Sequence, residues 1–226
     1  MKILAIDTAL PAVSVCVVET GVEQPLASEA MAMERGHAES LMPIIERVVG
    51  KLEGGFTALD RVAVTVGPGS FTGIRVGISA ARAIGLALSI PVVGVSTLSA
   101  FAAPIIINHP KSLVGIAIDA RHGNVYFAAF SDGKLIVAPR IATVREALRS
   151  LGTGHLLLAG SGAPMLAIEA WTVGQLVEVV GDLIAPDIGY VARLGMVADP
   201  ENALARPLYL KAPDAKPSNN TVQARG

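Results

Sequence analysis

The stretch that decides the fold reads Arg61-Val-Ala-Val-Thr-Val-Gly67-Pro-Gly-Ser-Phe-Thr-Gly73-Ile-Arg-Val-Gly77. Its first part, 61–66, is apolar and rich in β-branched residues, which predicts a buried strand. A glycine-rich loop follows over 67–73, and a helix is predicted from Ile74 to about Ser89, where Pro91 stops it. A strand that leads through a tight loop into a helix is a unit of α/β proteins.

The loop Gly67–Gly73 has two interpretations. Backbone N–H groups between a strand and a helix can cradle a phosphate. The residues match neither common phosphate-binding pattern, because Ile74-Arg75 follows the last glycine where a Walker A loop has Lys-Ser/Thr. In the dinucleotide-binding pattern, Thr72 occupies the position of the third glycine. A tight turn without a ligand fits the loop equally well.

The predicted helix carries small residues at every fourth position, namely Gly73, Gly77, Ala81 and Gly85. These residues share one face, and a glycine inside a helix costs about 1 kcal/mol relative to alanine. The close approach of another backbone would offset this cost. That backbone is either this chain's own sheet or a helix of another chain. The flanking residues are Ala80, Ile84 and Leu88.

The chain divides into two halves with a similar order of elements. The first half begins with strands over about 2–6, 13–18 and 26–33, and continues with a helix over about 39–52 and the segment above. The apolar stripe of that early helix consists of Leu41, Ile44, Ile45 and Val48. After a break at Asn108-His-Pro110, a second half repeats strand, hairpin and α/β units. We therefore expect lobes over 1–108 and 109–211, and a disordered tail over 212–226.

Composition excludes several classes of protein. The 18 Lys and Arg balance 19 Asp and Glu, so the chain lacks the basic excess typical of proteins that bind nucleic acid directly. One cysteine, Cys16, allows no internal disulfide and is expected to be a buried thiol in a strand. We predict no membrane span, no signal peptide and no metal site, and a cytoplasmic location.

A further set of residues could carry chemistry. Asp7 and Asp119 each end a predicted strand, where they either hold a phosphate-bound ligand or cap a turn. Arg75 and Arg82 lie seven residues apart on one face of the glycine-rich helix, where they either face solvent or contact an anion such as a nucleotide at an interface. The four histidines show no helical metal-binding spacing, and His37 is expected to lie at a helix start.

Several motifs together resemble the bacterial TsaB family, also called YeaZ. They are Ile3-Leu-Ala-Ile-Asp-Thr8, His37-Ala-Glu-Ser-Leu-Met-Pro43, Gly67-Pro-Gly-Ser-Phe-Thr-Gly-Ile-Arg75, Pro91-Val-Val-Gly-Val-Ser-Thr-Leu98, Asp119-Ala-Arg121 with Val125-Tyr126, and Pro207-Leu-Tyr-Leu210. The resemblance spans about residues 1–211, and its most specific part is the Gly-Pro-Gly loop with the helix after it. It implies an actin-like (ASKHA) fold of two similar lobes, each with a mixed sheet flanked by helices.

The resemblance also implies a role in forming threonylcarbamoyladenosine next to the anticodon of tRNA. In this family the chain is a non-catalytic subunit that binds the catalytic paralogue TsaD, with an ATPase of the TsaE type joining them. ATP and metal are then expected in the partner subunits, and tRNA contact only through the complex. The TsaD metal-binding histidines would fall at Thr97 and Phe101, which cannot replace them.

The resemblance makes the two apolar helix stripes the expected partner surface. The predicted contact residues are Leu41, Ile44, Ile45, Val48, Gly73, Gly77, Ala80, Ala81, Ile84, Gly85 and Leu88. On this interpretation, Gly77→Leu abolishes partner binding and leaves the fold intact. The same helices predict that the chain pairs with itself when alone. The alternative function is an actin-like ATPase or small-molecule kinase that uses Asp7 and Asp119, and a peptidase activity ranks last because no catalytic constellation supports it.

Overall fold

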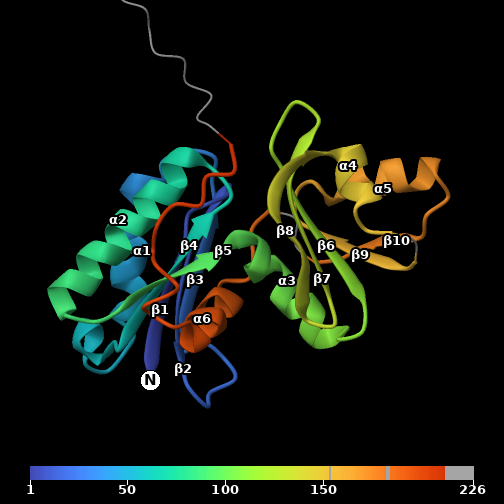
Figure 1. Cartoon of the computed structure of the whole chain (residues 1–226). Helices are drawn as coiled ribbons and strands as arrows, with labels where there is room; N and C mark the ends of the chain where they lie inside the picture. Colours follow the sequence, from blue (N-terminus) through green and yellow to red (C-terminus); the bar gives the residue numbers. More distant parts are fainter. Residues whose placement is uncertain (153, 182–183, 212–226) are drawn as a thin grey trace, which may run out of the picture.

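The computed structural model describes residues 1–152, 154–181 and 184–211, and it has two lobes, each built on a five-stranded mixed sheet (Figure 1). The strand order is β3-β2-β1-β4-β5 in the first sheet and, read from the matching edge, β8-β7-β6-β9-β10 in the second. In each sheet an antiparallel meander is extended by two parallel strands. The predicted fold of two similar lobes, each with a mixed sheet flanked by helices, is confirmed. The predicted tail over 212–226 lies outside the described residues.

The elements follow the predicted order closely. The strands are β1 (Lys2–Asp7), β2 (Ala12–Glu19), β3 (Ala27–Ala32), β4 (Arg61–Gly67), β5 (Val92–Ser96), β6 (Leu113–Asp119), β7 (Asn124–Ser131), β8 (Lys134–Thr143), β9 (Leu156–Ala159) and β10 (Val177–Val179). The helices are α1 (His37–Val49), α2 (Phe71–Leu88), α3 (Thr97–Asn108), α4 (Val144–Arg149), α5 (Ala163–Thr172) and α6 (Ile188–Val197), with a 3₁₀ turn at Gly55–Ala58. Helix α2 begins earlier than predicted because the Ser70 hydroxyl caps it by accepting from the Gly73 N–H.

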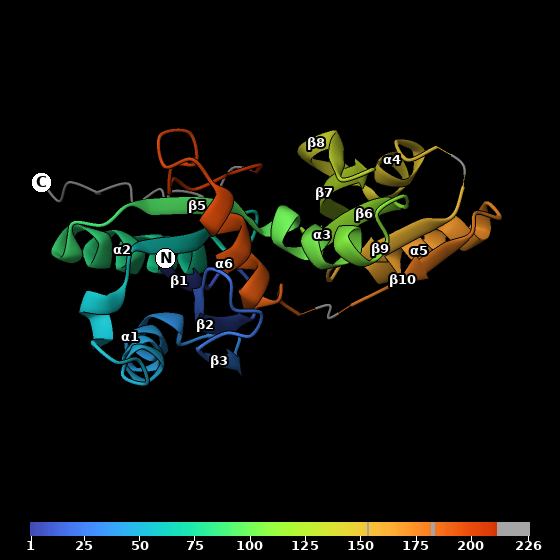
Figure 2. The same ribbon diagram turned by 90° about the horizontal axis from the view of Figure 1, so that it is seen from below.

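The first sheet is buried on both faces. Leu4 and Ile6 of β1 point to the layer formed by α1 and α2, while Ile3 and Ala5 point to α6 on the opposite face (Figures 1 and 2). The alternation follows from the two-residue period of a strand, and burial on both faces explains why β1 is continuously apolar. Cys16 belongs to the α6 side, where it is fully buried as predicted, and burial raises the pKa of its thiol to about 12.

The chain returns to the first lobe at its C-terminal end, which corrects the predicted boundaries. Helix α6 packs across β1, β2 and β4, and its Ile188, Val191 and Ala192 share a core with the first sheet. The following segment pairs Leu204 with Val93 of β5. Assigning all of 109–211 to the second lobe is therefore wrong, because the apolar face of α6 is buried on the first sheet. The periodicity within α6 did not reveal which sheet it covers.

The glycine face of α2 lies against this chain's own backbone. A Cβ atom on Gly73 would collide with the carbonyl oxygen of Thr8, and one on Gly77 with the Thr8 hydroxyl oxygen. The Thr8 hydroxyl also donates to the Gly73 carbonyl at 2.7 Å, which ties the helix to the hairpin between β1 and β2. Of the two interpretations of the stripe, packing on the chain's own sheet is therefore correct.

By length and composition, α2 is the one described helix that could cross a membrane. Its glycine face packs on β4 and on the β1–β2 hairpin, and Arg75 and Arg82 lie on its exposed face. A helix that covers a sheet with one face and exposes charged residues on the other can have the same length and composition as a membrane span. These two properties therefore do not distinguish the two cases for α2.

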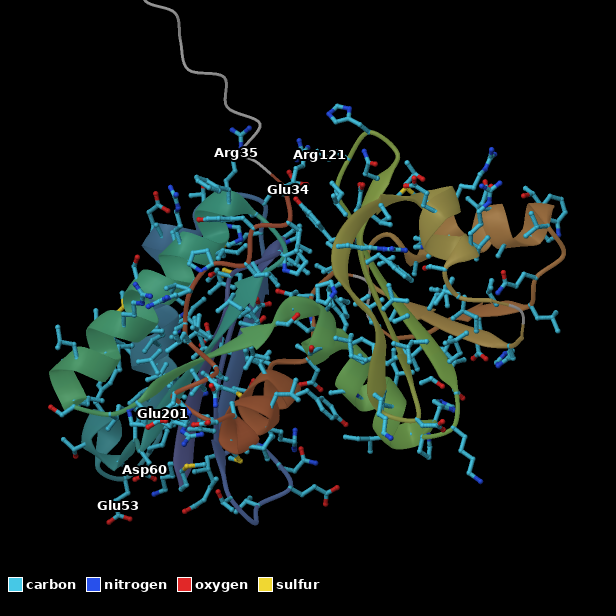
Figure 3. All side chains as sticks on the ribbon, in the orientation of Figure 1. Glu34, Arg35, Glu53, Asp60, Arg121 and Glu201 are labelled. Atoms are coloured by element: carbon cyan, nitrogen blue, oxygen red, sulfur yellow. The ribbon has the colours of Figure 1, made fainter. Side chains whose placement is uncertain are left out.

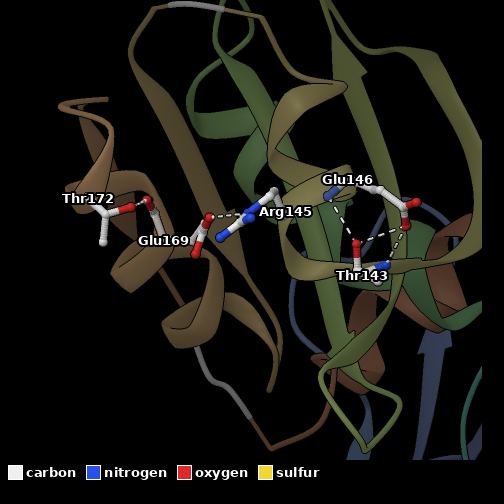
Figure 4. A network of polar contacts seen from close by, with 5 residues as sticks. All are labelled: Thr143, Arg145, Glu146, Glu169 and Thr172. Carbon is white, nitrogen blue, oxygen red and sulfur yellow. Dashed lines mark hydrogen bonds and ion pairs between the residues drawn. The ribbon is translucent and has the colours of Figure 1, made fainter.

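The second lobe is stabilised at its outer end by a polar network between helices (Figure 4). Thr143 and Glu146 form a capping box at the start of α4, because the hydroxyl of Thr143 accepts from the Glu146 N–H while the carboxylate accepts from the Thr143 N–H. Arg145 pairs with Glu169 of α5 at 2.9 Å. Helix α3 covers the opposite face of this sheet and also contacts the first lobe.

We predict that Gly77→Leu destabilises the fold, contrary to the expectation from sequence. The new side chain must displace Thr8 and the neighbouring Val64, and overpacking of this kind costs about 3 kcal/mol or more. Urea unfolding measures the change. The matched control is Ser79→Leu on the exposed face of the same helix, which should change the free energy of unfolding by less than about 1 kcal/mol. Equal stabilities of the two variants would contradict the packing described above.

Candidate functional site

An open groove runs between α1 and α2 on the outer face of the first lobe, with a volume of about 580 Å³. It is lined by Ala38, Leu41, Met42, Phe71, Thr72, Arg75, Val76, Ser79, Ala80 and Ala83. Most of these side chains are small or apolar, and Met42 is 41% exposed. An apolar groove between two neighbouring helices can accept a helix of another protein.

The structure corrects most of the predicted partner-contact residues. The stripe of α1 is buried in this chain's own core, with Ile44, Ile45 and Val48 fully inaccessible. The buried members of the combined set are Leu41, Ile44, Ile45, Val48, Gly73, Gly77, Ala81, Ile84 and Gly85. Apart from Leu41, which also lines the groove, these residues cannot contact a partner while the helices stay on the sheet. Ala80 and Leu88 are partly exposed, and Ala80 lines the groove.

On each helix, the groove residues lie on the face next to the predicted stripe. Ala38 and Met42 are four apart on α1, and Val76, Ser79 and Ala83 follow the three-and-four spacing on α2. The sequence contained this signal, because a surface helix that needed no partner would carry charged residues at such positions. The buried stripe is the stronger apolar pattern, and it masks the weaker exposed one.

The two predicted anion contacts differ in their surroundings. The guanidinium of Arg75 lies over the ring of Phe71, with its central carbon 3.7 Å from the ring centroid. Its Nε–H donates to the hydroxyl of Tyr209 at 2.8 Å, and the two rings are 5.1 Å apart. Arg82 is exposed and forms no hydrogen bond or ion pair with the described residues. Arg75 is therefore held in place, whereas Arg82 is a solvated side chain.

A larger cleft of about 1130 Å³ separates the two lobes. The β1–β2 hairpin and the Pro68–Phe71 loop line it from the first lobe, and Asp119, Arg121 and Ser161 line it from the second. Figure 3 shows Glu34, Arg35 and Arg121 at its mouth, where the lobes face each other. Phe71 lines both this cleft and the helix groove, so the two cavities are neighbours.

Asp7 is fully buried, and its contacts within the chain are structural. One carboxylate oxygen accepts from the Thr65 hydroxyl at 2.5 Å and from the Ala9 N–H at 3.0 Å. The other oxygen, Oδ2, is buried and has no hydrogen-bond partner among the described residues. Burial raises the pKa of this carboxyl, although the bonds from Thr65 and Ala9 and the charge of His37 oppose that rise. A carboxyl with this environment does not line the cleft.

Two backbone donors of the Gly67–Gly73 loop form hydrogen bonds within the chain. Ser70 N–H donates to the Ala9 carbonyl at 2.7 Å, and the Gly73 N–H donates to the Ser70 hydroxyl at 3.3 Å. In the second lobe Asp119 accepts from the Arg121 N–H at 2.7 Å and so caps a turn. The tight-turn interpretation of Gly67–Gly73 and the capping interpretation of Asp119 are the ones these contacts favour, which weakens the ATPase alternative.

Histidines and acids do not gather into a metal-binding group in the parts of the chain that the structure describes. His37 starts α1, and its Nε2 lies 3.0 Å from the Leu10 carbonyl, so it belongs to the wall of the interlobe cleft. Thr97 and Phe101, where TsaD-type histidines would fall, are both buried on α3. Their positions place them in the core and away from either cavity.

Residues 30–188 match the family model of TsaD, tRNA N6-adenosine threonylcarbamoyltransferase. The chain is 31% identical over 172 residues to the tRNA threonylcarbamoyladenosine biosynthesis protein TsaB of Escherichia coli, covering 72% of each chain. It is also 36% identical over 215 residues to an uncharacterized protein of Mycobacterium tuberculosis, covering 95% of this chain and 94% of the relative.

A solved structure agrees with the fold over almost the whole chain. YeaZ from Pseudomonas aeruginosa superimposes with a TM-score of 0.67 at 26% identity, covering 92% of this chain and 99% of the other. The similarity therefore includes both lobes and the helix pair that forms the groove.

We predict that the buried Asp7 makes the stability of the fold fall as the pH rises. Its pKa is higher in the folded state than the value of about 3.9 expected when unfolded, so between the two values the folded state binds more protons. The contribution of Asp7 is present in full below about pH 4 and is lost as the pH rises through the folded pKa. Urea unfolding of the wild-type protein and Asp7→Asn from acid to neutral pH measures this difference. Parallel curves for the two proteins would show that burial does not raise the pKa.

Proposed function

This chain belongs to the TsaB (YeaZ) family, and we propose that it acts in tRNA threonylcarbamoyladenosine biosynthesis as a non-catalytic scaffold subunit. Its role is to bind and order a TsaD-like catalytic paralogue through the α1–α2 groove. The observation that carries this proposal is the exposed, nearly uncharged groove on a lobe whose two helices are otherwise firmly packed on their sheet. A rigid apolar surface of this kind loses little entropy on binding.

The arrangement of the acids supports a non-catalytic role. A phosphate-transferring site needs carboxylates and N–H donors that face the ligand. Here Asp7 is buried beneath the hairpin, and Asp119 caps a turn. Thr97 and Phe101 lie in the core at the positions of the TsaD metal-binding histidines. On this proposal ATP and metal bind in the partner subunits.

The remaining members of the complex follow from the same family membership. We infer that a TsaE-like ATPase joins the pair and that tRNA is contacted through the assembled complex, in the cytoplasm. The nearly balanced charge of the chain agrees with indirect contact to tRNA. In the absence of its partner, the groove is expected to pair with a second copy of the chain at high concentration, because its exposed apolar lining favours burial against another surface.

Light scattering after size exclusion tests the scaffold role. The chain is measured alone and then with the TsaD-like protein of the same organism. A peak with the mass of a one-to-one complex is the expected result, and binding of Mg-ATP to the isolated chain, followed by calorimetry, should be absent. A chain that ignores the paralogue and binds Mg-ATP would overturn the proposal in favour of the ATPase alternative.

We predict that charge placed in the groove blocks this complex. Met42→Glu and Ala83→Glu put a carboxylate on an exposed apolar lining, and each should weaken partner binding by at least about tenfold. Val197→Glu on α6 is the matched control, because Val197 is 83% exposed on the same lobe but lies outside the groove. Titration calorimetry measures the three dissociation constants. Equal affinities would place the interface elsewhere.

A further inference from the structure

Arg75 is the one charged residue among those that line the groove. It is exposed, yet its position is fixed from two directions. The ring of Phe71 lies under the guanidinium at 3.7 Å, and the hydroxyl of Tyr209 accepts from Nε at 2.8 Å. Tyr209 also stacks on Phe71, with ring centroids 5.1 Å apart. The three side chains form a cluster at the end of the groove where α2 begins.

This cluster leaves the hydrogen-bonding edge of the guanidinium unused. Nε donates to Tyr209, but the terminal nitrogens form no hydrogen bond with the described residues, and the ion pairs in that part of the chain involve Arg47, Arg145 and His155 instead. The terminal N–H groups of an arginine form a fork that matches a carboxylate with two parallel hydrogen bonds. A fork that is already oriented loses less side-chain entropy when it binds.

We propose that Arg75 is a pre-ordered anchor for a carboxylate side chain on the partner's helical surface, and that Tyr209 is the positioning residue that orients it. This inference rests on the proposed function and adds the chemistry of the partner. The partner surface that enters the groove then carries small, apolar side chains and one acidic side chain opposite the start of α2. The negative charge of this partner side chain would complement Arg75, the single cation of an otherwise neutral groove. The planar guanidinium of Arg75 matches the two oxygens of a carboxylate.

The C-terminal segment contributes to this interface through Tyr209. The segment 203–208 is fixed across the first sheet, because the Gly94 N–H donates to the Ala203 carbonyl at 2.8 Å and the Leu208 N–H donates to the Val66 carbonyl at 2.7 Å. These bonds place Tyr209 beside α2, although the two are far apart in the sequence. The segment therefore connects the return of the chain to the first lobe with the geometry of Arg75.

Arg82 provides the matched control within the same helix. It carries the same charge and lies two turns further along α2, but within residues 1–152, 154–181 and 184–211 no aromatic ring or hydroxyl holds it. A mobile surface arginine contributes little to a complex because ordering it offsets the attraction. Arg75→Gln should therefore weaken binding of the TsaD-like protein by about 10- to 100-fold, whereas Arg82→Gln should change it by less than about threefold. Arg75→Lys should resemble Arg75→Gln, since lysine lacks the fork.

A double-mutant cycle tests the positioning role. Tyr209→Phe keeps the ring on Phe71 and removes the hydroxyl that accepts from Arg75. It should weaken binding by about 3- to 10-fold in the wild-type background and have no further effect in the Arg75→Gln background. A merely structural role of Tyr209 would weaken binding alike in both backgrounds. Titration calorimetry at two salt concentrations measures the dissociation constants of the wild type and of each variant. Thermal unfolding of each variant checks that it is folded.

The outcomes separate this inference from the proposed function. Binding by the wild-type chain with equal losses for Arg75→Gln and Arg82→Gln would overturn the carboxylate anchor and leave the scaffold role intact. A loss for Arg75→Gln that appears only when ATP is present would assign the anion to a nucleotide and would also overturn it. No binding by the wild-type chain would overturn the scaffold role, and the anchor with it.

Discussion

The close approach of α2 to the β1–β2 hairpin is the contact on which the rest of the first lobe depends. Thr8 donates its hydroxyl to the Gly73 carbonyl, and the Ser70 N–H donates to the Ala9 carbonyl, so the start of the helix is bonded directly to the hairpin. This distance is reached only because the helix has glycine where a Cβ would meet Thr8. The conformational cost of glycine in a helix is offset by these buried contacts.

The same contact determines what the two cavities can do. The Ser70 N–H of the Gly67–Gly73 loop donates to the Ala9 carbonyl of the hairpin, and the Gly73 N–H donates to the Ser70 hydroxyl, so these two donors are occupied within the chain. It also fixes α2 against the sheet and beside α1, so that Val76, Ser79 and Ala83 face outward. A chain that gives up ligand-binding loops while keeping a rigid apolar helix pair is suited to binding another protein.

The return of the chain to the first lobe adds the second constraint. Helix α6 buries the face of the first sheet opposite to α1 and α2, which makes that sheet the middle layer of three. The segment after α6 then crosses the ends of β4 and β5 and brings Tyr209 to Arg75. The groove is thus lined by residues of α1 and α2, and one of them, Arg75, is held by Tyr209 from beyond the second lobe.

The sequence by itself determined the elements, the α/β class and the buried thiol at Cys16, because these depend on local patterns of two and 3.6 residues. The motif set around Gly67–Gly73 also determined the family. It did not determine which surface covers each apolar face. The stripe of Leu41 to Val48 and the glycine stripe of α2 were assigned to a partner, yet both pack on the first sheet. Periodicity shows which residues share a face, but only the tertiary structure decides whether this chain or another one covers it.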